Sequence, residues 1–147
     1  MSSIALYFLN GGKLVGGYDK TKTDLTLSLS KKGAIINYEL NSNIIPGQFK
    51  DKKNTLVVYT PAISKDNIQL DYFIKNGFNI LKRSQILGVI SKNKFCIAIA
   101  GTHGKTTTST ILSHLLYENN VSFTSFIGGI SENYNSNLIE KGQEIIL

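Results

Sequence analysis

Residues 95–108 read FCIAIAGTHGKTTT, a run of apolar and small residues followed by a glycine-containing loop and a threonine-rich segment. The run at 95–100 predicts a buried strand, and a long helix is expected from about Lys105 to Glu118, ending at Asn119. A loop in this position points successive backbone N–H groups at one place, where the helix N-terminus adds partial positive charge. The sequence therefore predicts an anion site at residues 101–106.

The residue types in this loop indicate which anion it binds. Gly101 and Gly104 allow close backbone approach, Lys105 would reach the β- and γ-phosphates of ATP, and the Thr106 hydroxyl would bind Mg²⁺. The common phosphate loop has four residues between its glycines, whereas here Ile99 stands in the place of the first glycine, so GxxGKT is a shorter form. A plain strand-to-helix turn is the alternative, and the flanking strand and helix favour phosphate binding.

Upstream of the loop, short apolar strands alternate with helices. Helices are expected at residues 2–9, at 25–32 with Asp24 as the cap, at 66–76 and at 83–90, and strands at 13–17, 34–37, 55–59 and 79–81. The TLVVY run at 55–59 is typical of a buried parallel strand. A further strand is expected at 121–127, with Gly128 and Gly129 at its exit. This alternation predicts βαβ units, a mostly parallel sheet and a domain boundary near residues 91–94.

Composition excludes several classes of protein. The chain has 147 residues, enough for one domain or two small ones, and its net charge of +6 comes from lysines spread thinly along the sequence, which favours a solvated surface over a nucleic-acid interface. The single cysteine, Cys96, permits no internal disulfide and is expected to be a buried structural thiol. The sequence contains neither a membrane-spanning run nor a leader peptide, so a cytoplasmic location is expected.

The two histidines predict no metal site. His103 lies in the loop, where it either contacts substrate or phosphate or is an exposed turn residue. His114 is expected mid-helix as a packing or surface residue. Neither histidine has an expected carboxylate partner.

GTHGKTTT after an apolar strand resembles the ATP loop of the Mur ligase family. YTPAISKDN at residues 59–67, NGFNILKRSQIL at 76–87 and FIGGI at 126–130 resemble the members that join L-alanine to UDP-N-acetylmuramate, and the resemblance covers nearly the whole length. It implies that ATP phosphorylates the muramate carboxyl and that L-alanine attacks the acyl phosphate, with ATP and Mg²⁺ as cofactors. It implies no nucleic-acid or membrane partner.

The resemblance also implies roles for individual residues. Lys105 matches the catalytic loop lysine and Thr106 the Mg²⁺-binding threonine. The phosphate cradle corresponds to Gly101, Thr102, His103, Gly104, Lys105, Thr106 and Thr107. The UDP-sugar-binding positions correspond to Asp19, Thr60, Pro61 and Ala62, with a simple turn residue as the alternative for Asp19.

The chain departs from the family pattern at several places. Met1-Ser2 matches the end of the family's glycine-rich loop, Tyr38-Glu39 stands where relatives often have a histidine, and the acidic Mg²⁺-binding strand and the amino-acid-binding domain would follow Leu147. We therefore expect a fragment that is inactive alone. Its α/β fold is expected to be a truncated Rossmann-like parallel sheet domain at residues 1–92, holding the UDP-sugar, followed at 93–147 by the start of a P-loop ATP-binding domain.

Two other functions remain open at this stage. One is a recycling ligase that attaches a preformed tripeptide to UDP-N-acetylmuramate, although the TPAI and KRSQIL segments favour the alanine enzyme. The other is a regulatory nucleotide-binding module without chemistry.

Overall fold

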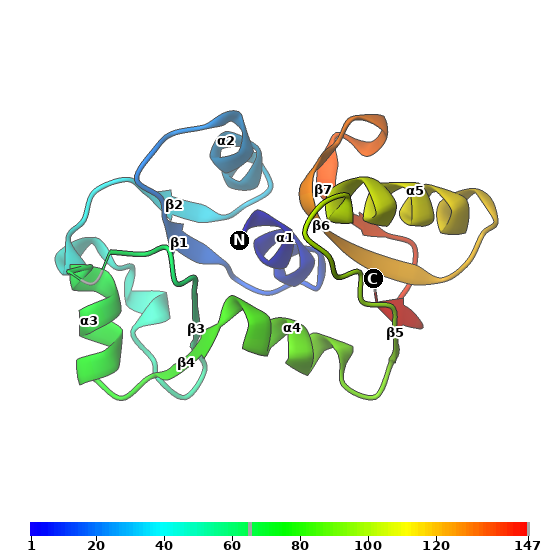
Figure 1. The fold of residues 1–147 in the computed structure, drawn as a ribbon. Helices are drawn as coiled ribbons and strands as arrows, with labels where there is room; N and C mark the ends of the chain where they lie inside the picture. The colour runs from blue at the N-terminus through cyan, green and yellow to red at the C-terminus, as the bar shows by residue number, and fades with distance from the viewer. Residues whose placement is uncertain (65, 147) are drawn as a thin grey trace. The chain divides into compact units, whose positions relative to one another are not determined.

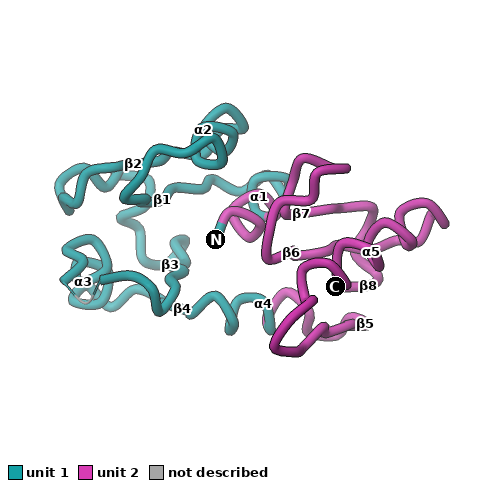
Figure 2. The backbone as a smooth tube through the Cα atoms, turned by 45° about the horizontal axis from the view of Figure 1, so that its top comes forward, with its two compact units in different colours: residues 1, 8–88 teal, residues 2–7, 89–147 magenta. Residues whose placement is uncertain are grey.

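The computed structural model describes residues 1–64 and 66–146. The chain divides into two compact units: Met1 with residues 8–88, and residues 2–7 with 89–147 (Figure 2). The helix α1 (Ser2–Asn10) contributes residues to both units. No helix in the described residues is long and apolar enough to cross a membrane.

The first unit is built from short βα elements (Figure 1). After α1 its elements are β1 (Gly16–Tyr18), α2 (Asp24–Lys31), β2 (Ile35–Asn37), the 3₁₀ turns η1 (Ser42–Ile44) and η2 (Gly47–Phe49), β3 (Leu56–Tyr59), α3 (Ile68–Lys75), β4 (Asn79–Lys82) and α4 (Arg83–Ser91). The strands form two parallel pairs, β1 with β2 and β3 with β4. The predicted alternation of strands and helices is confirmed.

Two details of this unit differ from the prediction. Strand β3 is parallel, but its residues are half-buried or exposed, because it has a hydrogen-bonded neighbour on one side only. The cap of α2 is Thr23 and not Asp24: the Thr23 hydroxyl accepts from the Thr26 N–H at 3.3 Å, and the Thr26 hydroxyl accepts from the Thr23 N–H at 2.9 Å. This reciprocal pair satisfies two helix-end donors at once, whereas Asp24 already lies inside the helix.

The second unit is a sheet with one long helix on it. It contains β5 (Phe95–Cys96), α5 (Lys105–Glu118), β6 (Phe123–Ser131), η3 (Glu132–Tyr134), β7 (Ser136–Glu140) and β8 (Ile145–Ile146). The sheet order is β5-β8-β6-β7, with β7 antiparallel to β6 and the other pairs parallel. Helix α5 runs along β6 (Figure 1), as the β–loop–α prediction requires, and its bounds agree with those expected.

The core of the second unit lies between α5 and this sheet. Phe123, Ile127 and Ile139 are almost fully buried there, and Leu116 of α5 packs against them. The apolar face of α5 thus meets the buried face of β6 and β7. This packing holds α5 in place, and the predicted phosphate loop leads into the first turn of this helix.

Three predictions for this unit are wrong. Among the described residues the strand expected at 95–100 is limited to Phe95–Cys96, which pairs with β8, and the Ile97 N–H donates to the Ile146 carbonyl. Cys96 is exposed, since β5 is an edge strand of the described sheet. Gly128 and Gly129 lie inside β6 and are not at its exit.

Candidate functional site

The loop at residues 101–104 has backbone geometry that depends on its two glycines. Gly101 has φ +149° and Gly104 has φ +77°, a region that residues with a side chain rarely occupy. Gly104 is the N-cap of α5 and provides no side-chain hydrogen bond to the helix. The first-turn N–H groups of α5 have no acceptor within the helix, so they are available to an anion.

Lys105 is directed toward the loop and not into the core. Its Nζ donates to the Gly101 carbonyl at 2.5 Å and to the Thr102 carbonyl at 3.2 Å. Residues 101–108 are all exposed. The ammonium group of Lys105 therefore lies beside the loop and is hydrogen-bonded to its carbonyl oxygens. A phosphate oxygen could take the place of these carbonyls as its partner.

The donor set fits Mg²⁺ bound together with a triphosphate. Among the described residues no group of three or more His, Cys, Asp or Glu side chains could hold a metal by itself. The exposed Thr106 hydroxyl, in the first turn of α5, would be one oxygen ligand and phosphate oxygens would supply others. His103 is also exposed, and its side chain forms no hydrogen bond or ion pair within the described parts of the chain.

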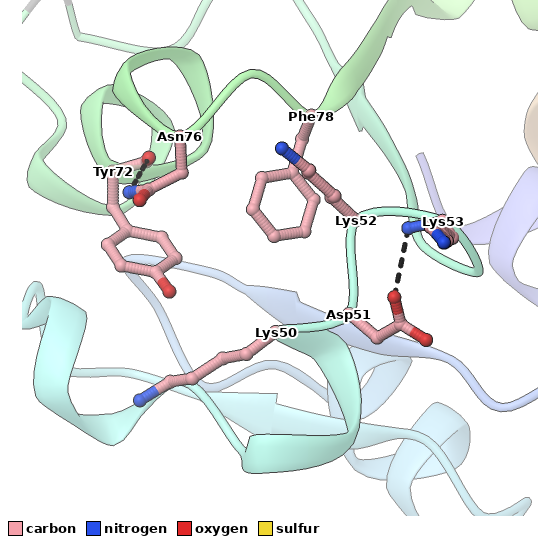
Figure 3. Close-up of a pocket in the computed structure, with 7 residues that line it drawn as sticks. All are labelled: Lys50, Asp51, Lys52, Lys53, Tyr72, Asn76 and Phe78. Atoms are coloured by element: carbon pink, nitrogen blue, oxygen red, sulfur yellow. Dashed lines mark hydrogen bonds between the residues drawn. The ribbon is translucent and has the colours of Figure 1, made fainter.

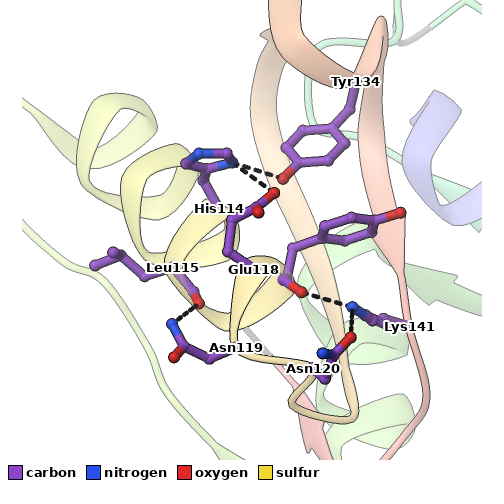
Figure 4. A network of polar contacts seen from close by, with 8 residues as sticks. His114, Leu115, Glu118, Asn119, Asn120, Tyr134 and Lys141 are labelled. Carbon is purple, nitrogen blue, oxygen red and sulfur yellow. Dashed lines mark hydrogen bonds and ion pairs between the residues drawn. The ribbon is translucent and has the colours of Figure 1, made fainter.

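His114 lies in a polar network on the C-terminal half of α5 (Figure 4). Its Nδ1 lies 2.9 Å from the Tyr134 hydroxyl and 3.9 Å from a Glu118 carboxylate oxygen, so the expectation of no carboxylate partner is wrong. The i,i+4 spacing of His114 and Glu118 on a helix was the sequence signal for this pair. Burial and then the Glu118 carboxylate raise the pKa of Tyr134 above its ordinary value. The network ties η3 to α5 and contributes no ligand-binding group to the loop.

The residues expected near the UDP-sugar follow two parallel strands. Asp19 comes directly after β1, where its Oδ1 accepts from the Thr21 N–H at 3.0 Å. Thr60, Pro61 and Ala62 come directly after β3 in a turn. The carboxyl ends of parallel strands are the usual ligand side of open α/β sheets. Since β1 and β3 belong to different two-stranded sheets, no shared sheet edge brings these residues together.

A shallow basic hollow of about 370 Å³ lies elsewhere in the first unit (Figure 3). It is lined by Lys50, Asp51, Lys52, Lys53, Tyr72, Asn76 and Phe78. These residues surround the segments that lead into β3 and β4, so the hollow lies at the amino ends of those strands and away from Thr60–Ala62. The Lys53 N–H, and then Asn54, lower the pKa of Asp51 by hydrogen bonding. The three lysines are neighbours in the sequence and all line this hollow, where they attract anions without specifying one.

We predict that Gly104→Ala weakens the loop. A side chain at φ +77° costs about 1–2 kcal/mol, so the first turn of α5 would move to relieve it. The affinity for Mg-ATP should fall in a titration of the complete gene product. Gly47→Ala is the control, because Gly47 has no positive φ and nothing within 4 Å of an added Cβ. Equal affinities in the two variants would contradict the role of the loop geometry.

The strand–loop–helix connection, with lysine and threonine in the first helical turn, places this chain among α/β proteins that have an anion-site geometry at a helix N-terminus. Residues 1–95 match the family model described as Mur ligase family, catalytic domain. The chain belongs to the Mur ligase family. The residues matched by the family model end before the loop at 101–106. The alignments with individual relatives extend over nearly the whole chain and include the loop.

These relatives share one name. The chain is 50% identical over 145 residues to UDP-N-acetylmuramate–L-alanine ligase from Flavobacterium psychrophilum, covering 99% of this chain and 32% of that protein. It is 51% identical over 139 residues to the ligase of the same name from Parabacteroides distasonis, covering 95% of this chain and 30% of that protein. The crystal structure of UDP-N-acetylmuramate–alanine ligase from Thermotoga maritima superposes with a TM-score of 0.85 at 27% identity, covering 99% of this chain and 33% of that one. The chain thus spans about a third of the length of its relatives.

Proposed function

We propose that this chain supplies the ATP-phosphate loop and part of the sugar-nucleotide-binding region of a ligase that joins L-alanine to UDP-N-acetylmuramate. The observation that carries the proposal is the exposed loop at residues 101–106, with Lys105 Nζ on the loop carbonyls and Thr106 in the first turn of α5. The identity of about 50% to ligases with this name supports the choice of substrates. The peptidoglycan precursor pathway in the cytoplasm is the proposed setting.

The reaction has two steps. A carboxylate oxygen of UDP-N-acetylmuramate attacks the γ-phosphorus of ATP, and the bond to ADP breaks to give an acyl phosphate. The amine of L-alanine then attacks the acyl carbon, and phosphate leaves as the amide forms and a proton is lost. Mg²⁺, when bound, offsets negative charge on the phosphate oxygens.

The residues of this chain act on the first step. The free N–H groups at the start of α5 hold the phosphates, and Lys105 stabilises the charge that develops on the transferred phosphoryl group. Thr106 would ligand the metal ion. Residues 93–147 are proposed as the beginning of the ATP-binding domain and residues 1–92 as the UDP-sugar-binding domain, with Asp19 and Thr60–Ala62 near the nucleotide.

Assay of ADP release by the complete gene product tests the proposal. ADP should form with Mg-ATP, UDP-N-acetylmuramate and L-alanine, and omission of any one should abolish turnover. Turnover with a preformed tripeptide in place of L-alanine would identify the recycling ligase. Binding of Mg-ATP without ADP release in either reaction would identify a non-catalytic module.

A further inference from the structure

Gly128 and Gly129 lie in the interior of β6, where glycine is an unfavourable choice. Glycine weakens a strand because it loses more backbone entropy on folding and offers no side chain to pack. Neither residue has a positive φ, so backbone conformation does not require glycine at either position. Two structural reasons for glycine remain, a close approach by another part of the molecule and an irregularity in the strand ladder.

The group that approaches is Thr106. A Cβ added to Gly128 would lie 3.4 Å from Thr106 Oγ1, and one added to Gly129 would lie 3.3 Å from Thr106 Cγ2. The contact at Gly129 is tighter than the roughly 3.5–4.0 Å of favourable carbon–carbon contacts, so Thr106 would have to move by a few tenths of an ångström, whereas 3.4 Å from Gly128 to the oxygen is an ordinary van der Waals contact. Thr106 is exposed on its other sides. The Thr106 side chain therefore lies against the backbone of β6 at Gly128 and Gly129.

A second contact fixes α5 on β6 further along the helix. Ser113 Oγ lies 2.8 Å from Ser125 Oγ, and both side chains are fully buried. Ser113 is seven residues after Thr106, two helical turns away on the same face of α5. Because the buried serine pair holds the later turns of α5 on β6, crowding at Thr106 would be relieved by its side chain or by the first turn of the helix.

We propose that Gly129 is a positioning residue that sets the Thr106 side chain for binding Mg-ATP. The inference rests on the proposed function, because it assigns to Thr106 the role of metal ligand. The strand register between β6 and β7 shifts between Phe126 and Ser131, so the same glycines lie in an irregular part of the ladder. If the glycines served only this irregular pairing, replacing them would not affect Thr106. The two explanations therefore predict different effects on Mg-ATP binding.

The test measures Mg-ATP binding by the complete gene product and its Gly129→Ala variant. A displacement of a few tenths of an ångström at Thr106 should weaken Mg-ATP binding by roughly tenfold, since sites lose activity steeply as their ligands move. Binding of ATP in EDTA should be unchanged, because the hydroxyl contributes only through the metal. Gly128→Ala, whose added Cβ would lie at ordinary van der Waals distance from Thr106 Oγ1, should weaken Mg-ATP binding less than Gly129→Ala. The control is Gly88→Ala in α4, where nothing lies within 4 Å of the added Cβ.

A double-mutant cycle separates positioning from general damage. Thr106→Ser keeps the hydroxyl and removes Cγ2, the atom that the Gly129→Ala methyl would meet. The double variant should therefore bind Mg-ATP about as well as Thr106→Ser alone. An equal loss in both backgrounds, or a Gly129→Ala affinity equal to that of Gly88→Ala, would overturn the inference. Failure of the wild-type protein to bind Mg-ATP would instead overturn the proposed function.

Discussion

Replacing Lys105 with alanine should lower kcat in the complete gene product by about 100-fold or more and leave the KM for UDP-N-acetylmuramate nearly unchanged. Loss of one electrostatic donor to a transition state typically costs about 3 kcal/mol. Lys105 is exposed, and its Nζ contacts only carbonyls of its own loop in the described structure, so it supports no core packing. The proposed sugar-nucleotide residues follow β1 and β3 in the other compact unit, which is why ground-state binding of the sugar should not depend on Lys105.

Removal of the lysine also removes its two hydrogen bonds to the loop carbonyls. If their loss disorders the loop, Mg-ATP binding will weaken; if the lysine acts mainly in the transition state, Mg-ATP binding will change little while kcat falls. Pre-steady-state measurement of ADP formation, together with Mg-ATP titration, separates the two effects. Lys92→Ala is the matched control, since Lys92 is an exposed lysine outside the loop. Wild-type turnover in Lys105→Ala, or a parallel rise in the KM for the sugar nucleotide, would count against the assigned role.

The strand–loop–helix unit could be predicted from sequence because its signals are local. The glycines at 101 and 104 mark the loop before the helix, and Asn119 caps its C-terminal end. The expected bounds of α5 therefore agree with those in the structure. The start of α2 was placed one residue late because Thr23 and Asp24 are both good caps. Only the reciprocal bond with Thr26 decides between them.

The errors arise where structure depends on residues distant in sequence. Gly128 and Gly129 are expected at a strand end because glycine usually interrupts strands, whereas the structure places them inside β6 and beside Thr106. Cys96 was expected to be buried because its neighbours are apolar. Its exposure follows from the position of β5 at the edge of the described sheet, and strand order cannot be read from local pattern.

The site itself was only partly accessible to sequence reasoning. Motif and spacing identify the loop. The hydrogen bonds of Lys105 Nζ to two loop carbonyls and the closeness of Thr106 to the backbone of β6 can be seen only in the three-dimensional structure. The lysines at 50, 52 and 53 are close in sequence, but the hollow that they line also needs Tyr72, Asn76 and Phe78 on its other side, which depends on tertiary packing. The sequence thus identifies which chemical groups are present, whereas tertiary packing determines where they point.

Phe123→Ala should be the most destabilising single substitution that we predict, because Phe123 is fully buried at the centre of the core between α5, β6 and β7. Truncating a buried phenylalanine costs about 3–5 kcal/mol through lost burial and the cavity that remains. Leu116 of α5 packs against the same core, so loosening it should also loosen the helix that carries the phosphate loop. The unfolding free energy of the second unit should therefore fall together with its affinity for Mg-ATP.

Hydrogen exchange of the β6 and β7 amides in the complete gene product measures this effect locally, without requiring the whole protein to unfold in one step. The control is Ile130→Ala on the same strand, where the side chain is 55% exposed and truncation should cost less than about 1 kcal/mol. Protection of the β6 amides should drop by two or more orders of magnitude in Phe123→Ala and change little in Ile130→Ala, because each 1.4 kcal/mol corresponds to a factor of ten. Equal protection in the two variants would mean that the stability of this unit does not depend on the Phe123 core.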